Sequence, residues 1–399
     1  MALSSHRLFR TPTLAACAMA ALVTAACSTH RASTSAVPPS SPSQRAGAQT
    51  AAAELPPIHH VFVIVLENKS FETTFGPSSP APYLADTLVK QGALLTNYYG
   101  TGHFSLDNYI TMVSGQAPDS ATQADCSIYT DFVQTGTAEY GQVVGHGCVY
   151  PASVHTIADQ LTEHGLTWKG YMEDMGNDPA REPAACGHVA IGTPDHTNRA
   201  APTDQYATKH DPFAYFHSII DSPICQTNVV RLEQLAHDLA QTATTPNYTF
   251  ITPDLCSDGH DAKCADGGPG GLEAANTFLR TWVPRILQSP AFRDDGLLIV
   301  TFDEAAGSDA TACCNEQPGP NTKAPGWTGP GGGRIGAVLL SPFITAGTVS
   351  HTPYNHYSML KSVEELFHLP YLGYAAQDGL VSFSTDVYTN PHASAKPKH

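Results

Sequence analysis

Four apolar runs that end in oxygen-bearing side chains constrain the fold of this chain more than any other feature. They are HVFVIVLEN (60–68), NYTFITPD (247–254), GLLIVTFDE (296–304) and IGAVLLSPF (335–343). Short continuous apolar runs are typical of buried parallel strands. Helical patterns alternate with them, at 83–92, 154–165, 272–288 and 357–369. This alternation predicts an α/β layered fold with a central, mostly parallel sheet and helices on both faces.

Polar side chains gather where three of these strands are predicted to end. Ligands of open α/β sheets bind beyond the carboxyl ends of the strands. A single acidic pair there is more often a solvated turn or a helix cap, but three clusters at one edge favour a divalent metal ion, whose identity the ligand types do not decide. The side chains are Glu67 and Asn68 after the first run, Asp254, Asp258, His260 and Asp261 after the second, and Asp303 and Glu304 after the third.

The stretch TGHFSLDNYITMVSG (101–115) places Ser105 at the start of a predicted helix, because Leu106, Tyr109, Ile110 and Val113 are spaced as one apolar stripe. An isolated serine at such a position is usually an N-cap. An exposed hydroxyl among the free N–H groups of a helix N-terminus also suits a phosphate and an alkoxide. A metal held by the strand-end oxygens would activate this hydroxyl as a nucleophile.

Residues 1–27 have the pattern of a secretory signal, with two arginines, an apolar run and small residues before Cys27. The end of this segment also resembles a bacterial lipoprotein processing site. We therefore expect a bacterial protein that is secreted, periplasmic or held at the outer cell surface, with a lipid anchor on Cys27 and plain secretion as the two alternatives. Residues 28–57 predict a disordered Ser/Thr/Pro/Ala tether, and residues 386–399 a flexible tail.

The charge of the chain limits its partners. Its net charge is −16, and removing the two arginines of the signal segment makes the mature chain still more acidic. This balance argues against nucleic acid, or an anionic bilayer, as a partner held by electrostatics. It suits an exported protein that holds cations.

The cysteines predict disulfides. An even number of cysteines in an exported chain is typical of disulfide pairing, and without a CxxC spacing a thiolate zinc site is not expected. Cys256 and Cys264 could close a short loop; the sequence alone leaves the pairing open. Within a predicted domain over 58–385, the region 116–234 has weak periodicity and is expected to form an insert over the site. The cysteines beyond residue 27 are Cys126, Cys148, Cys186, Cys225, Cys256, Cys264, Cys313 and Cys314.

The segment HVFVIVLENKSFE, with Phe-Gly at 75–76, resembles the opening motif of the bacterial phosphoesterase family, which contains acid phosphatases and phospholipases C and lies within the alkaline phosphatase superfamily. Three later segments, TGHFSLDNY (101–109), TFDE (301–304) and YNHYS (354–358), are similar to later motifs of that family. The four motifs occur in order over nearly the whole predicted domain. The resemblance implies an alkaline-phosphatase-like fold; Lys69 stands where the family usually has arginine.

The resemblance also implies the members of a metal site. Glu67 and Asn68 match the family's first pair of metal ligands, and Asp303 with Glu304 matches the acidic pair that completes the site. Ser105 would be both a metal ligand and the nucleophile.

Further roles follow from the same resemblance. In distantly similar nucleotide phosphodiesterases the nucleophile lies ten residues before a glycine, and this count back from Gly115 also reaches Ser105. It places Asn108 on the phosphate-binding asparagine. His103 would be a phosphate ligand or a proton donor to the leaving group.

A second set of residues could hold another metal or bind phosphate. Asp258, His260 and His356 resemble, in order and type, the Asp/His/His set of two-metal members of the superfamily. Asp254 competes with Asp258 for the first role. In single-metal relatives, the corresponding histidines would bind phosphate.

Together these features imply an exported metal-dependent phosphatase, similar to acid phosphatases, that hydrolyses monoesters through a phosphoserine. Its substrate would be a small-molecule or lipid phosphate ester, such as a phosphoinositide. Phospholipase C members of the family look longer at the C-terminal end, which favours a phosphatase. A phospholipase C-type phosphodiesterase is the first alternative. A non-catalytic metal-binding surface lipoprotein on a degenerate esterase fold is the second.

Overall fold

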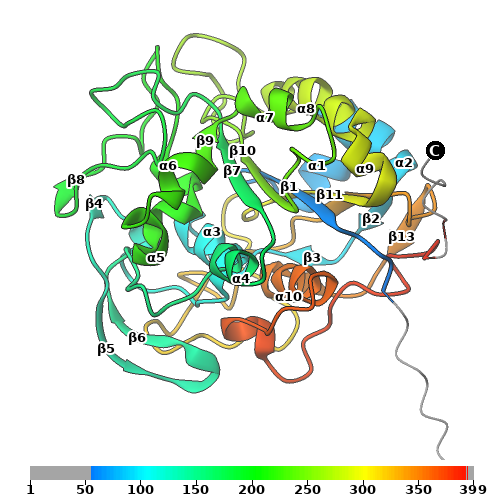
Figure 1. The fold of residues 1–399 in the computed structure, drawn as a ribbon. Coiled ribbons are helices and arrows are strands. Elements are labelled where there is room, and N and C mark those ends of the chain that lie inside the picture. Colours follow the sequence, from blue (N-terminus) through cyan, green and yellow to red (C-terminus); the bar gives the residue numbers. More distant parts are fainter. Residues whose placement is uncertain (1–54, 392, 394–399) are drawn as a thin grey trace, which may run out of the picture. The chain divides into compact units, whose positions relative to one another are not determined.

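A central sheet organises the part of the chain that the computed structural model describes, residues 55–391 and 393 (Figure 1). Helices cover both faces of the sheet, so the predicted α/β layered fold is confirmed. From one edge to the other, the strands of this sheet are β13 (Thr348–Ser350), β2 (Ala93–Leu95), β12 (Ala337–Leu340), β11 (Gly296–Phe302), β1 (His60–Leu66), β10 (Tyr248–Thr252), β7 (Trp168–Met172) and β9 (Val229–Arg231).

All strands of this sheet run in one direction except β12. The run 335–343 is predicted to be a parallel strand, and this prediction is wrong. A parallel neighbour needs a crossover that returns the chain to the starting edge of the sheet. Residues 303–336, which join β11 to β12, form no helix of the kind that usually makes this crossover, and β12 pairs antiparallel with β11.

The helices lie in two groups on opposite faces of the sheet (Figure 1). All four helical patterns of the sequence fold as helices, the first of them as the π-helix η1 (Tyr83–Leu88) continued by α2. One face carries α1 (Phe71–Phe75), α2 (Val89–Gln91), α8 (Gly271–Gln288) and α9 (Pro290–Asp295), and the other carries α3 (Ser105–Ser114), α4 (Ile157–Glu163) and α10 (His356–Leu366).

Helix α8 illustrates how the sequence pattern becomes packing. Leu272, Ala275, Leu279, Val283 and Ile286 are spaced three or four residues apart and are all buried. This spacing places them on one face of the helix. Burying each of the larger aliphatic side chains stabilises the fold by about 1.5–3 kcal/mol. The apolar stripe therefore holds α8 against the core.

The region 116–234 is only partly the insert that the sequence predicts. It also supplies β7, β9 and helix α4 to the main layers. Both strands are short and carry weak alternation, which is why their pattern does not reveal them. The remaining elements of this region are β4 (Ile128–Tyr129), β5 (Val133–Thr137), β6 (Val143–His146), β8 (Thr193–Pro194), α5 (His217–Ile220), α6 (Ile224–Asn228) and the turns η2 (Thr122–Ala124), η3 (Glu139–Gly141), η4 (Thr208–His210) and η5 (Pro212–Tyr215).

Three short elements outside this region complete the secondary structure around the sheet. Strands β3 and β14 pair parallel with each other and precede α3 and α10 in the chain. These elements are β3 (Tyr98–Tyr99), β14 (Tyr354–Asn355) and α7 (Gln234–Asp238), with the turn η6 (Gly373–Ala376) near the C-terminal end.

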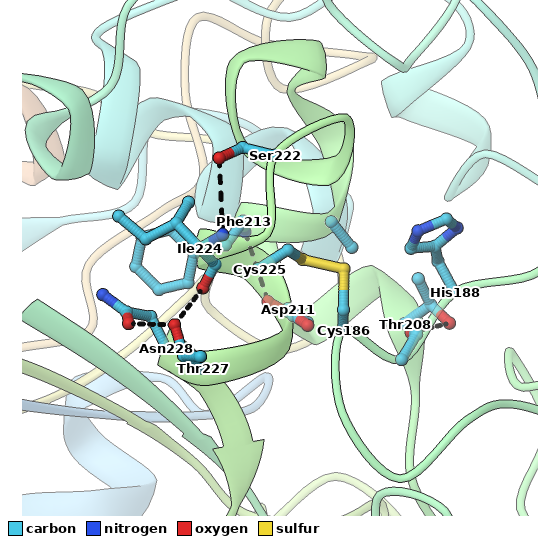
Figure 2. Close-up of a disulfide and its surroundings, with 12 residues drawn as sticks. Cys186, His188, Thr208, Asp211, Phe213, Ser222, Ile224, Cys225, Thr227 and Asn228 are labelled. Carbon is cyan, nitrogen blue, oxygen red and sulfur yellow. Dashed lines mark hydrogen bonds between the residues drawn. A yellow bond between two sulfur atoms is a disulfide. The ribbon is translucent and has the colours of Figure 1, made fainter.

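The predicted disulfides are confirmed. Cys186, in the loop after β7, is joined to Cys225 in α6, and Figure 2 shows this bond beside Thr208 and Asp211. Closing the 39-residue separation between these cysteines stabilises the fold by on the order of 3–4 kcal/mol in the chain-entropy model. The four pairs are Cys126–Cys148, Cys186–Cys225, Cys256–Cys264 and Cys313–Cys314.

The domain extends further toward the C-terminus than the sequence predicts. Residues 386–391 fall in the range expected to be a flexible tail, yet Val387 and Tyr388 are buried. The carboxylate of Asp386 accepts a hydrogen bond of 2.9 Å from Tyr354 Oη, and Asn390 N donates to Phe343 O. This segment is therefore part of the packed domain.

The predicted signal segment with Cys27 lies outside the described residues, as do most of the tether and the last residues of the tail. Among the helices of residues 55–391, none is long and apolar enough to cross a membrane.

Helix α10 contains a buried carboxyl, that of Glu364, which should make the stability of the protein depend on pH. Glu364 is fully buried, with Oε1 accepting a 2.8 Å hydrogen bond from Leu372 N. Burial, helped by the charge of neighbouring Glu365, raises the pKa of Glu364 to about 9. The pKa of Glu364 is higher in the folded state than in the unfolded state. The contribution of its protonated carboxyl to the free energy of unfolding is therefore complete below the unfolded-state pKa and is lost as the pH rises toward 9.

We therefore expect Glu364→Gln, which keeps the acceptor for Leu372 N, to stabilise the protein at pH 8 by about 1–3 kcal/mol and to have little effect near pH 4. Urea unfolding at several pH values measures this difference. Glu163→Gln, at an exposed position of α4, is the control. An equal effect of Glu364→Gln at both pH values would contradict the prediction.

Candidate active site

The carboxyl ends of β1 and β11 bring the two predicted acidic pairs together. The two strands are parallel neighbours, with Leu66 opposite Phe302, so the residues that follow them share one edge of the sheet. Asn68 N donates a 2.9 Å hydrogen bond to Asp303 Oδ1. The side-chain Nδ2 of Asn68 also donates a hydrogen bond to Glu67 Oε2 at 2.7 Å. The predicted convergence of these strand ends is confirmed.

Ser105 is the first residue of α3 and points at this edge. The N-cap of α3 is Phe104, in an extended conformation (φ −158°, ψ 149°), and its side chain makes no cap hydrogen bond. Ser105 Oγ donates instead to Glu67 Oε2 at 2.7 Å. The interpretation of Ser105 as an ordinary N-cap is therefore wrong. Its hydroxyl lies among carboxylates at a helix N-terminus.

His210, which is not among the predicted site residues, also lies in this cluster. Its Nε2 is 3.3 Å from Glu67 Oε1 and its Nδ1 is 3.8 Å from Asp258 Oδ2. The ring stacks on Tyr109 of α3 with centroids 5.1 Å apart. His210 comes from η4, in a region without periodicity or motif, so no local signal in the sequence marks it. Its position beside Glu67 and Asp258 is visible only in the folded chain.

The two aspartates that compete for a place in the site lie in different surroundings. Asp258 faces His210, and its main-chain oxygen accepts a 2.8 Å hydrogen bond from Glu67 N. Asp254 instead accepts from the main-chain amides of Cys256 and Ser257 and so closes its own turn. The structure therefore places Asp258, and not Asp254, beside Glu67.

The two histidines predicted with Asp258 do not join the cluster. His260 is half exposed and contacts Asp261 at 2.8 Å. His356 is fully buried, but its Nε2 lies 2.6 Å from the main-chain oxygen of Asp303 and its Nδ1 lies 3.2 Å from Tyr98 Oη. Both ring nitrogens of His356 are thus occupied by protein groups. This geometry makes His356 a support for the Asp303 main chain and disfavours its predicted role as a ligand.

The side-chain amide of Asn108 is likewise hydrogen-bonded to main-chain groups of the loop that precedes Ser105. Its Oδ1 accepts from the amides of Thr101 and Gly102 at 2.9 Å each, and its Nδ2 donates to Phe104 O at 2.9 Å. The residue is fully buried. Its side chain therefore fixes the loop that precedes Ser105, which disfavours the predicted direct contact with phosphate.

His103 and Glu304 form a pair next to Ser105. His103 Nδ1 is 2.7 Å from Glu304 Oε2, and both side chains are largely buried. The hydrogen bond to Glu304 raises the pKa of His103 above its usual value. Among the residues that the structure describes, Nε2 of His103 has no hydrogen-bond partner. This arrangement orients one ring nitrogen on a carboxylate and leaves the other available to a ligand.

The centre of the cluster has the properties of a cation site. Burial raises the pKa of Glu67, Asp258 and Asp303 well above their usual values, and neighbouring carboxylates add to the effect. Burial lowers the pKa of His210, which keeps its imidazole neutral. Within the described residues, Glu67 Oε1, Asp258 Oδ2, Asp303 Oδ2 and both ring nitrogens of His210 are buried without hydrogen-bond partners. Such unpaired groups are costly unless a ligand satisfies them, and oxygen with imidazole donors suits a divalent metal ion.

Cys256, Cys264 and Asp266 do not form a metal site, although their potential ligand atoms lie close together. Cys256, Cys264 and Asp266 offer atoms that all lie within 4.8 Å of one another. The two cysteines are joined as a disulfide and so provide no thiolate.

The comparison with known protein families shows the family of this chain. The chain belongs to the phosphoesterase family, whose model matches residues 78–370. The opening motif at 60–76 precedes the matched range. In the comparison of solved structures, the protein is similar to a protein of the alkaline phosphatase superfamily from Vibrio parahaemolyticus, with 13% identity, a TM-score of 0.45 and coverage of 79% of this chain and 69% of that chain.

The related proteins found include acid phosphatases and a phosphatidylinositol-3-phosphatase. A probable acid phosphatase of Kluyveromyces lactis is 26% identical over 315 residues, which are 78% of this chain and 59% of that protein. A phosphatidylinositol-3-phosphatase of Mycobacterium tuberculosis is 24% identical over 328 residues, which are 82% of each chain. The match thus spans less than two thirds of the yeast relative's length.

Proposed function

We propose that this protein is an exported, divalent-metal-dependent phosphatase that hydrolyses phosphate monoesters through a phosphoserine on Ser105. The observation that carries the proposal is the 2.7 Å hydrogen bond from Ser105 Oγ to Glu67 Oε2 at the start of α3. A hydroxyl at a helix N-terminus, among buried groups that suit a cation, is arranged for attack on phosphorus. Membership of the phosphoesterase family and the names of the relatives support hydrolysis of phosphoric esters.

The residues that would hold the cation are Glu67, Asn68, Ser105 and Asp303, with His210 and Asp258 beside them. When bound there, a divalent ion would neutralise the carboxylates, lower the pKa of the serine hydroxyl and stabilise charge on the phosphoryl oxygens. Glu304, predicted as a further ligand, uses Oε2 for His103, so we assign it the orientation of that ring.

The reaction then uses the groups of this chain in two steps. Ser105 Oγ forms a bond to phosphorus, and its proton passes to Glu67 Oε2, the acceptor it already contacts. The bond from phosphorus to the alcohol oxygen breaks, and Nε2 of protonated His103 gives this oxygen a proton. Glu304 stabilises the imidazolium through Nδ1. Water then attacks phosphorus and gives a proton to neutral His103. The bond from phosphorus to Ser105 Oγ breaks, protonated Glu67 returns its proton to Oγ, and the serine is restored as phosphate leaves.

The substrate class is a small-molecule or lipid phosphate ester. The similarity to a phosphatidylinositol-3-phosphatase over most of both chains supports a phosphoinositide as one candidate. Export is supported by the disulfides and by the signal pattern of residues 1–27. A lipid anchor on Cys27 remains a prediction, and so does the absence of nucleic acid as a partner.

A substrate panel tests this function directly. We expect the metal-loaded protein to hydrolyse p-nitrophenyl phosphate at least ~100-fold faster than bis(p-nitrophenyl) phosphate, and to lose this activity on chelation and regain it with a divalent cation. The p-nitrophenol released, with and without chelator, is the measurement. Preference for the diester would favour the phosphodiesterase alternative. No turnover of either ester by protein that binds metal would favour the non-catalytic alternative.

A further inference from the structure

A largely buried lysine lies beside the cluster, on a side that the predicted site residues do not occupy. Lys209 belongs to η4 and directly precedes His210. Its Nζ is 2.9 Å from Asp125 Oδ2. The other oxygen of Asp125 accepts a 3.2 Å hydrogen bond from Leu106 N, the amide next to Ser105. One carboxylate therefore connects the Lys209 ammonium to the start of the helix that carries Ser105.

The surrounding fold fixes the turn that carries Lys209. Thr208 N donates to Thr197 Oγ1 at 2.8 Å, and Thr208 Oγ1 donates to Gly187 O at 3.2 Å, beside the Cys186–Cys225 disulfide. Figure 2 shows Thr208 and Asp211, which lie on either side of Lys209 and His210 in the chain, next to this disulfide. On the other side, Thr252 Oγ1 at the end of β10 donates to His210 O at 3.0 Å. The position of the ammonium is thus set by the fold.

The Lys209 ammonium has hydrogen-bonding capacity that the protein does not use. An ammonium carries three N–H donors. In residues 55–391, its one recorded hydrogen-bond partner is Asp125, and its side chain is 15% exposed. The group is a cation with unused donors close to the carboxylate cluster.

A phosphate monoester needs such a cation here. It enters as a dianion, and the edge of the sheet already holds Glu67, Asp258, Asp303 and Glu304. Lys69, the other lysine near these carboxylates, donates to Asn68 O at 3.3 Å. A buried cation with unused donors is suited to a phosphoryl oxygen, because charge-assisted hydrogen bonds in a site that excludes water are strong.

We propose that Lys209 binds a non-bridging oxygen of the substrate phosphoryl group beside Ser105, and that Asp125 holds the ammonium in place between turnovers. This inference rests on the phosphatase function proposed above. It adds a substrate-binding residue from the region 116–234 to the groups supplied by the strand ends. The competing explanation is structural: Lys209 would do no more than neutralise the partly buried carboxylate of Asp125.

A double-mutant cycle separates the two explanations. The proteins are the wild type, Lys209→Met, Asp125→Asn and the double variant, all metal-loaded. The probe is inorganic phosphate, with binding measured by calorimetry and kcat/KM measured on p-nitrophenyl phosphate. We expect Lys209→Met to weaken phosphate binding and lower kcat/KM by about 10- to 100-fold. The double variant should remain as weak as Lys209→Met, although it no longer has an unpaired carboxylate. Recovery of wild-type phosphate binding by the double variant would overturn the proposal.

Controls keep this result separate from folding and from the proposed function. Lys169→Met removes a similar ion pair, Lys169 Nζ to Asp238 Oδ2 at 2.7 Å on β7, and should leave phosphate affinity unchanged. Thermal unfolding checks that each variant is folded. A wild type that hydrolyses monoesters, together with a Lys209→Met variant that binds phosphate equally well, contradicts this inference alone. A wild type that neither hydrolyses monoesters nor binds phosphate contradicts the proposed function as well.

Discussion

Ser105→Ala is expected to lower kcat for p-nitrophenyl phosphate by about 10⁴-fold or more, because it removes the atom that forms the covalent bond to phosphorus. The substitution leaves Glu67 Oε2 with a remaining donor, the amide of Asn68 at 2.7 Å. The fold should therefore be retained. Steady-state kinetics with excess divalent cation measure the loss, and circular dichroism checks the fold.

Ser114→Ala is the matched control for this experiment. Ser114 lies at the other end of the same helix, is also buried, and its hydroxyl donates to Ile110 O within the helix. The chemical change is identical, and we expect kcat within about twofold of the wild type, since a buried side chain outside the site acts mainly on stability. If Ser105→Ala retained turnover close to that of Ser114→Ala, the nucleophile would have to be another group.

Glu67→Gln is expected to have the second largest effect, with metal binding lost and kcat/KM reduced by about 10³-fold. Glu67 lies at the centre of the cluster, with Oε2 accepting from Ser105 and Asn68 and Oε1 3.3 Å from His210 Nε2. Removing its charge takes away a strong ligand for a cation. In the metal-free protein the same change removes a buried carboxylate whose pKa is raised by burial and by Asp303.

Glu67→Gln is expected to lower metal binding and activity without lowering the stability of the metal-free protein. The metal-free variant should unfold at the same temperature as the metal-free wild type or a higher one, because a buried charge is lost. Added divalent cation should raise the Tm of the wild type and not that of the variant. Glu72→Gln, at an exposed position of α1, is the control and should respond to metal as the wild type does. An equal Tm increase with metal in Glu67→Gln would remove Glu67 from the metal site.

The strand-end part of the site could be predicted from the sequence because local pattern and sheet topology determine it together. Glu67, Asn68 and Asp303 follow parallel neighbours directly, so their convergence depends only on the register of β1 and β11. The position of Ser105 at a helix start follows from the spacing of the apolar residues of α3. The direction of β12 could not be predicted in this way, because an apolar run is the same in either direction.

Other side chains of the site depend on contacts that only the folded chain reveals. His210 and Lys209 lie in a short turn without periodicity, and the packing of the region 116–234 brings them to Glu67 and Asp125. Asn108 and His356 are polar residues within recognisable motifs, yet main-chain groups occupy their side chains. Residue type and motif therefore predicted which segments come together at the strand ends. Only the structure shows which of these polar atoms are hydrogen-bonded to the main chain and which are left for a ligand.

The most direct test of the central claim is to trap the covalent intermediate. Metal-loaded protein is mixed with excess p-nitrophenyl phosphate, quenched in acid within the first turnovers, digested and analysed by mass spectrometry. We expect one phosphoryl group on the peptide that contains Ser105, and none in Ser105→Ala treated in the same way. A phosphoryl group on another residue, such as His103, or product formation by the wild type through a pre-steady-state burst without any phosphorylated peptide, would contradict the account.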